Sequence, residues 1–165
     1  MKTVLPVLTL CLVTACGGSS IEPTSASFTS PSSTPSTGVT ADVSFQGLLN
    51  DVRSDAGSNP VTYNAQLDLA AQRHAQDMLD NNYFSHTGLN GSTAGERATA
   101  AGYNWRTVGE NIAAGFNSES SVLDAWVNSP GHQANNINPN FEEFGLGYAS
   151  SGSGNRWVLM LGAQR

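Results

Sequence analysis

Three short polar blocks carry the side chains of this sequence that are best suited to chemistry. They are Phe84-Ser85-His86, Gly109-Glu110-Asn111 and Ser129-Pro130-Gly131-His132. Each block lies beside a predicted helix in a segment with the composition of a loop, and functional side chains concentrate in loops that rigid elements hold in place. Two neutral imidazoles and one carboxylate are a sufficient ligand set for Zn²⁺ or a similar divalent cation. Without a metal, the same groups serve as acid and base.

The wide spacing of His86, Glu110 and His132 leaves other interpretations open. It does not match a local metal motif, such as two histidines one helical turn apart. The three side chains are equally suited to a buried polar network that fixes long loops. A triad of Ser129, His132 and Glu110 can also be drawn, but the sequence has no nucleophile elbow or oxyanion motif, and a hydroxyl in a Ser-Pro-Gly turn commonly caps the local backbone.

The elements that position these blocks follow from hydrophobic periodicity, which predicts helices over 43–56, 65–81, 94–101 and 119–128. The second helix is the clearest, and His74 lies on its apolar face, so we expect a core or boundary histidine there. Gly102 ends the third helix and Ser118 caps the fourth. Pro130-Gly131 is expected to break the fourth helix.

Near the C-terminus the period changes from helix to strand. Phe144, Leu146 and Tyr148 alternate with small residues, whereas residues 157–161 are apolar at every position. This pattern predicts a hairpin whose second strand is buried on both faces and therefore central. Helices around a small antiparallel sheet predict an α+β sandwich.

The N-terminal residues predict export. Residues 3–15 are mostly apolar and follow Lys2, but the run is too short to span a bilayer, which needs about 20 residues. The run ends in Val13-Thr14-Ala15-Cys16, which resembles the lipobox of bacterial lipoproteins. We expect residues 1–15 to be a signal peptide and Cys16 to be lipidated, which would anchor the chain to a membrane. The alternative is an ordinary secretory signal with an incidental cysteine.

A tether and one domain follow the signal. Of residues 17–42, 19 of 26 are Ser, Thr, Pro or Gly, and such a segment buries too little surface to offset chain entropy. We therefore divide the mature chain into the lipidated cysteine with its linker, residues 16–42, and a domain over residues 43–165. No cysteine follows Cys16, which excludes disulfides and Cys-ligated zinc. The net charge of -6 and a single lysine exclude a nucleic-acid partner, and we expect a monomer.

The domain resembles the CAP superfamily of cysteine-rich secretory proteins, antigen 5 and pathogenesis-related proteins, also called SCP domains, and within it the compact bacterial branch. Three segments that carry the resemblance are Tyr83-Phe84-Ser85-His86-Thr87, Val108-Gly109-Glu110-Asn111-Ile112-Ala113 and Ala125-Trp126-Val127-Asn128-Ser129-Pro130-Gly131-His132. Residues 59–64, 74–78, 100–103, 138–141 and 145–149 also match, and all the segments occur in the order of the family.

The resemblance implies an α-β-α sandwich with a central antiparallel sheet, and a cleft that holds two histidines and two acidic residues. His86, Glu110 and His132 match three of these four, and Ser129 stands at the place of the second glutamate. The missing charge weakens attraction for a divalent cation. We expect Asn111 and Ser129 to support the other three in the cleft. Asn136 and Leu159 depart from the bacterial pattern, which has an apolar residue and often a glutamine there.

The resemblance also implies a role in binding more firmly than a reaction, because family members bind sterols, fatty acids, peptides, receptors and sometimes zinc. We expect an exported, membrane-anchored binding or accessory module of the cell envelope or exterior. Its expected ligand is a small apolar molecule, a peptide, a glycan or a divalent metal such as Zn²⁺. One alternative is a metal-assisted hydrolase that uses His86, Glu110 and His132. The other is a purely structural network, with an interaction function elsewhere.

Overall fold

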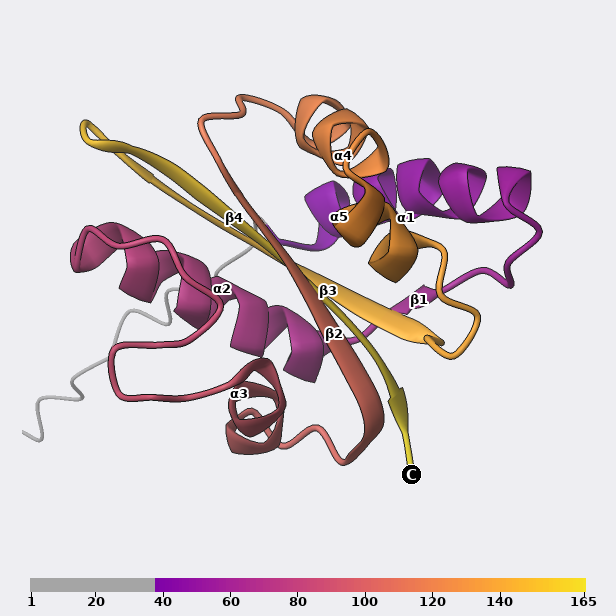
Figure 1. Ribbon diagram of the computed structural model, residues 1–165, viewed down its shortest axis with the longest axis horizontal. Coiled ribbons are helices and arrows are strands. Elements are labelled where there is room, and N and C mark those ends of the chain that lie inside the picture. The colour runs from indigo at the N-terminus through magenta and orange to yellow at the C-terminus, as the bar shows by residue number, and fades with distance from the viewer. Residues whose placement is uncertain (1–37) are drawn as a thin grey trace, which may run out of the picture. The chain divides into compact units, whose positions relative to one another are not determined.

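The structure is a computed structural model that describes the backbone of residues 38–165 and the side chains of residues 44–165 (Figure 1). The predicted signal peptide, Cys16 and the linker up to residue 37 lie outside the described residues. The described elements are α1 (Gly38–Asp55), β1 (Thr62–Tyr63), α2 (Ala65–Asp80), α3 (Ala94–Ala100), β2 (Trp105–Ala114), α4 (Glu119–Val127), α5 (Pro130–Asn136), β3 (Glu143–Ser151) and β4 (Gly154–Gln164).

Three layers form the domain, with one sheet between two groups of helices. The sheet has the strand order β1-β3-β4-β2, and its three long strands are antiparallel neighbours. Helices α2 and α3 cover one face, and α1, α4 and α5 cover the other (Figure 1). The predicted α+β sandwich is confirmed. The sheet is mixed rather than purely antiparallel, because the short β1 pairs with β3 in parallel.

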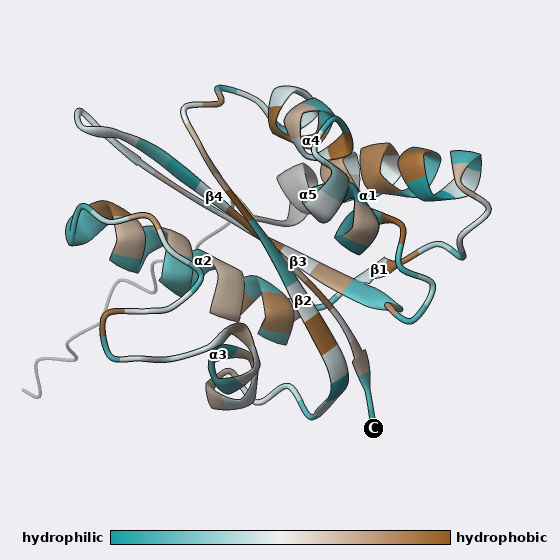
Figure 2. Cartoon of the chain, in the orientation of Figure 1, coloured by the Kyte–Doolittle hydropathy of each residue, from teal (hydrophilic) through white to brown (hydrophobic). Residues whose placement is uncertain are grey.

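Strand β4 is the central element, as the sequence predicted. Its residues Trp157, Leu159 and Leu161 pack into the core under α1 and α4, while Val158 and Met160 pack into the core under α2. Leu159 is fully buried, which explains an apolar residue at this place in the strand. In Figure 2 the hydrophobic residues of α1, α4 and β4 gather where these elements meet. One strand therefore contributes side chains to both hydrophobic cores.

Helix α2 lies directly on β3 because two glycines let the backbones approach. A Cβ added at Gly145 would overlap the backbone of Asp68, and one added at Gly147 would overlap the backbone of Ala71. The Gln72 side chain fixes this contact, since it donates to the carbonyl of Tyr148 (2.9 Å) and accepts from its amide (3.0 Å). The alternation of Gly with Leu and Phe in β3 thus marks a helix-packing face.

The structure also corrects several predicted boundaries. Helix α1 begins at Gly38 rather than at residue 43. Pro130 begins α5 instead of only ending α4, because proline suits the first turn of a helix, whose amide has no partner in any case. Strand β2 was not predicted, since polar Glu110 and Asn111 interrupt its apolar pattern.

Candidate functional site

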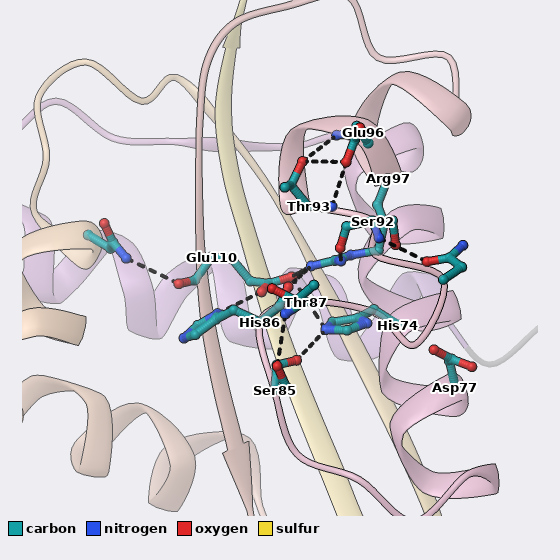
Figure 3. Close-up of polar contacts among 12 residues, drawn as sticks. His74, Asp77, Ser85, His86, Thr87, Ser92, Thr93, Glu96, Arg97 and Glu110 are labelled. Atoms are coloured by element: carbon teal, nitrogen blue, oxygen red, sulfur yellow. Dashed lines mark hydrogen bonds and ion pairs between the residues drawn. The ribbon is translucent and has the colours of Figure 1, made fainter.

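Glu110 is the centre of the polar site. It lies in the middle of β2, opposite Met160 of β4, with a side chain that is only 3% exposed. Its Oε1 is 2.7 Å from His86 Nδ1, and its Oε2 is 2.6 Å from Arg97 Nη2 (Figure 3). One buried carboxylate thus connects a strand, the loop after α2 and helix α3.

Arg97 supplies the charge that makes this burial tolerable. Its side chain comes from α3 and is 10% exposed, so the ion pair with Glu110 is largely shielded from water. The same guanidinium donates to the carbonyl oxygens of Ser92 (2.7 Å) and His86 (3.0 Å). A buried charge needs both a partner and further hydrogen bonds, and Arg97 obtains them by holding the loop that carries His86.

His86 is the exposed member of the network. A carboxylate only accepts, so the contact with Glu110 assigns the proton to Nδ1. In the neutral ring this leaves the lone pair on Nε2, and the side chain is 57% exposed. The arrangement fixes the orientation of the ring and presents a hydrogen-bond acceptor to an arriving molecule.

His74 of α2 lies next to Glu110 and is buried, as expected for a residue on the packed face of this helix. Its Nε2 donates to the carbonyl of Ser85 (3.0 Å) and lies 4.0 Å from Glu110 Oε2. Burial lowers the pKa of His74, although the nearby Glu110 charge acts in the opposite direction. We therefore treat His74 as a neutral ring that supports the loop segment before His86.

The lowered pKa of His74 predicts a pH dependence of stability. Below the ordinary value of 6.5 the unfolded chain takes up a proton at His74 that the folded chain does not, so the free energy of unfolding falls as pH falls. In a His74→Gln variant, which keeps a donor for Ser85 but does not titrate, this part of the decline should vanish. Urea unfolding of both proteins from neutral to mildly acidic pH measures it, and parallel curves would contradict the assignment.

Asparagines fix α5, and with it His132, against β2. The buried Asn111 donates through Nδ2 to the carbonyl of His132 (3.1 Å) and to Asn136 Oδ1 (2.9 Å). Asn135 donates to Asn111 Oδ1 (2.8 Å) and to the carbonyl of Glu110 (3.2 Å). The departure at Asn136 therefore has a structural reason, since this buried amide completes the bonding of Asn111. The expected supporting role of Asn111 is a backbone contact to His132.

An apolar groove of about 360 Å³ lies beside these residues. Its lining consists of Phe84, Ile112, Ala113, Ala114, Phe116, Ala125, Trp126, Ser129 and His132. Ser129 is the N-cap residue of α5 but its side chain makes no capping hydrogen bond, contrary to the capping role considered from the sequence. Burial, and to a lesser degree the nearby His86, lowers the pKa of His132. The groove thus joins an apolar wall to a hydroxyl and a neutral imidazole.

The pairing of Glu110 bears on its predicted role as a metal ligand. Both oxygens of Glu110 are occupied by Arg97 and His86 Nδ1, and no ion pair within 4.0 Å joins Glu110 to His132 among the described residues. The described part of the chain also contains no group of three His, Cys, Asp or Glu side chains that could hold a metal ion. The same pairing removes the triad of Ser129, His132 and Glu110, because the carboxylate orients His86 instead.

The structure moves two of the predicted blocks out of loops. Glu110 and Asn111 lie in β2, and His132 lies in α5, whereas His86 does lie in a loop. Arg97 was not predicted, since one arginine on a short helix gives no signal that distinguishes it from a surface residue. His74 was predicted as a core residue and not as a neighbour of the site that it borders.

Comparison with known proteins identifies the family that shares this architecture. The family model of CAP, the cysteine-rich secretory protein family, matches residues 46–161. YkwD of Bacillus subtilis (strain 168) is 39% identical over 106 residues, which cover 64% of this chain and 41% of YkwD. The membrane protein YlbC of the same organism is 27% identical over 108 residues, which cover 66% of this chain and 31% of YlbC. The match thus spans less than half the length of either relative.

Solved structures agree with the fold. An extracellular protein of Bacillus anthracis that contains an SCP domain superimposes with a TM-score of 0.70 at 28% identity, over 77% of this chain and 41% of that one. An outer surface protein of Borrelia burgdorferi gives a TM-score of 0.68 at 22% identity, over 74% of this chain and 91% of that one. Within residues 38–165, no helix is long and apolar enough to cross a membrane.

Proposed function

The chain belongs to the CAP family of cysteine-rich secretory proteins, and from this premise we propose that it is a binding module of the cell envelope or exterior. Its ligand is a small molecule with an apolar body and a polar end. The observation that carries this proposal is the groove in which the apolar side chains of Phe84 and Trp126 meet Ser129 and His132.

The composition of the groove suits such a ligand. Small-molecule sites are mostly apolar concavities with a few polar groups that fix orientation. Here Phe84 is 52% exposed, so a ligand that covers it removes apolar surface from water. Ser129 and His132 offer hydrogen bonds at one side, and His86 lies close enough for its charge to influence His132. These features favour binding over catalysis, since no hydrogen bond between described residues joins a hydroxyl to the imidazole of His86 or His132.

The Glu110 network has a structural role in this proposal. It orients His86 and holds the loop after α2 against β2, and it takes no part in chemistry. Of the alternatives open from the sequence, the structural network describes Glu110 best, while the groove beside it supplies the binding function.

We also propose that the module works at a membrane surface. The lipobox-like end of the signal supports lipidation of Cys16, and the Ser, Thr and Pro residues between Cys16 and the start of α1 suit a tether. The monomeric state expected from the sequence remains part of the proposal.

A fluorescent fatty acid tests the groove. We expect cis-parinarate to bind the purified full chain saturably, and a Phe84→Ala variant to bind about tenfold more weakly, because a large apolar contact is lost. The control is Leu89→Ala, which removes an even more exposed apolar residue outside the groove. Equal affinities of wild type and the Phe84 variant, or no saturable binding, would refute the proposal.

A further inference from the structure

We infer that a second cavity, between α2 and the loop that follows it, is a binding site for a neutral, hydroxyl-rich ligand such as a mono- or disaccharide. The cavity has a volume of about 380 Å³ and shares no lining residue with the apolar groove. Seven of its eight lining residues are polar or charged, and those that carry the inference are Arg73, His74, Asp77, Asn90, Ser92 and Arg97. The inference therefore goes beyond the function proposed above and does not depend on it.

His74 brings an unused acceptor to this cavity. Because Nε2 donates to Ser85, the neutral ring carries its lone pair on Nδ1. Nδ1 is buried and has no hydrogen-bond partner among the described residues. Figure 3 shows this nitrogen on the side of the ring that faces Asp77, away from Glu110. A buried acceptor without a partner destabilises the folded state, because it has lost its bond to water.

Arg97 brings an unused donor. Its two terminal nitrogens bond Glu110, Ser92 and His86, but Nε is buried and lacks a partner in the described part of the chain. Native proteins rarely leave such atoms unpaired, so each one requires an explanation. Two orphaned atoms of opposite character on residues of one cavity indicate a missing group that both donates and accepts.

The two orphaned atoms favour a hydroxyl over an ion. An anion only accepts, so it would suit Arg97 Nε but oppose the lone pair of His74 Nδ1. Arg73 opposes a cation at the exposed rim, although the carboxylate of Asp77 also lines the cavity. A hydroxyl donates and accepts, and sugars carry several. The volume lies near the lower end of the range for small-molecule sites, about 300–1,000 Å³, which suits a ligand of this size.

The exposed rim offers further bonds of both kinds. The Arg73 guanidinium makes no hydrogen bond to another described residue, and the Asn90 side chain uses only its oxygen, to accept from the Ser92 amide (2.9 Å). Leu89 is 67% exposed and offers an apolar contact for a sugar ring. His74 Nδ1 and Arg97 Nε are closed off from solvent, so lining side chains must move before a ligand reaches these two atoms.

Titration calorimetry of the purified full chain with neutral disaccharides tests the inference. The probes are cellobiose, maltose and N,N′-diacetylchitobiose at millimolar concentrations, with sodium acetate as an anion that only accepts. We expect saturable binding of at least one disaccharide, and no competition by acetate. Arg73→Ala and Asn90→Ala change exposed side chains and leave the fold intact, and each should weaken binding about fivefold, as for one lost hydrogen bond.

Two control variants identify the cavity. Arg106→Ala removes an exposed arginine that lines neither cavity, and Phe84→Ala alters only the apolar groove. Both should bind the disaccharide as wild type does. The inference is overturned if none of the disaccharides binds, if acetate displaces the sugar, or if the Arg73 and Asn90 variants bind normally. Loss of sugar binding in the Phe84 variant would overturn it as well, because binding would then lie in the groove.

Discussion

Replacing Glu110 by alanine should destabilise the domain by about 3–5 kcal/mol, because it leaves the guanidinium of Arg97 buried without its counter-charge. The cost is large because Arg97 is 10% exposed and water cannot easily replace the lost carboxylate. Loss of Glu110 also removes the one hydrogen bond that the His86 side chain makes to a described residue. Urea unfolding followed by the fluorescence of the buried Trp126 and Trp157 measures the change.

The chain contains a matched control for this experiment. Glu142 forms an ion pair with Arg106 at 3.0 Å, but both side chains are more than half exposed. Glu142→Ala should therefore cost less than about 1 kcal/mol. The double variant Glu110→Gln, Arg97→Gln should lose less than the sum of its single variants, since the two charges stabilise each other. Equal losses in the Glu110 and Glu142 variants would show that the buried pair does not support the fold.

The second large effect is expected at Gly147, where alanine should cost about 3 kcal/mol or more. The added methyl group would meet the backbone of Ala71 in α2, and a backbone cannot turn aside as a flexible side chain can. Relief requires α2 to lift from β3, which would break the paired hydrogen bonds between Gln72 and Tyr148. Thermal and urea unfolding of the variant measure the loss.

Gly152→Ala is the control for this steric effect. Gly152 lies in the turn between β3 and β4, and a Cβ there would meet no atom within 4 Å. Its substitution should change stability by less than about 0.5 kcal/mol. Neither glycine has a positive φ, so the two variants differ in packing and not in backbone strain. A tolerated Gly147→Ala would mean that α2 and β3 do not approach as closely as the structure places them.

The sequence predicts those elements whose own residues determine them. Helices α2 and α4 end within one residue of their predicted bounds, since each combines a clear apolar stripe with a polar N-cap, Asn64 or Ser118. Strands β3 and β4 follow from alternation and from an apolar run. Strand β2 and helix α5 escape prediction because their functional polar residues and Pro130 obscure the local pattern. The secondary structure of such segments is determined by tertiary contacts.

The sequence predicted His86 and Glu110 as members of the site, but it did not predict Arg97 or the pairing of the side chains. The family resemblance brings His86 and Glu110 together, and their contact at 2.7 Å agrees with it. No local pattern reveals that Arg97 takes the second carboxylate oxygen, because a helix surface commonly carries an arginine. This contact places Glu110 at the centre of a polar network.

The alternation of β4 has a consequence for how the domain opens. Odd-numbered residues 157–161 belong to one core and even-numbered residues to the other. If either helical layer detached, one face of β4 would become exposed to solvent. Local opening of either layer therefore exposes the same strand. We therefore expect the amide hydrogens of β4 to exchange with deuterium only through global, cooperative unfolding. A chain without disulfides would in this way keep both halves of its interior at a common stability.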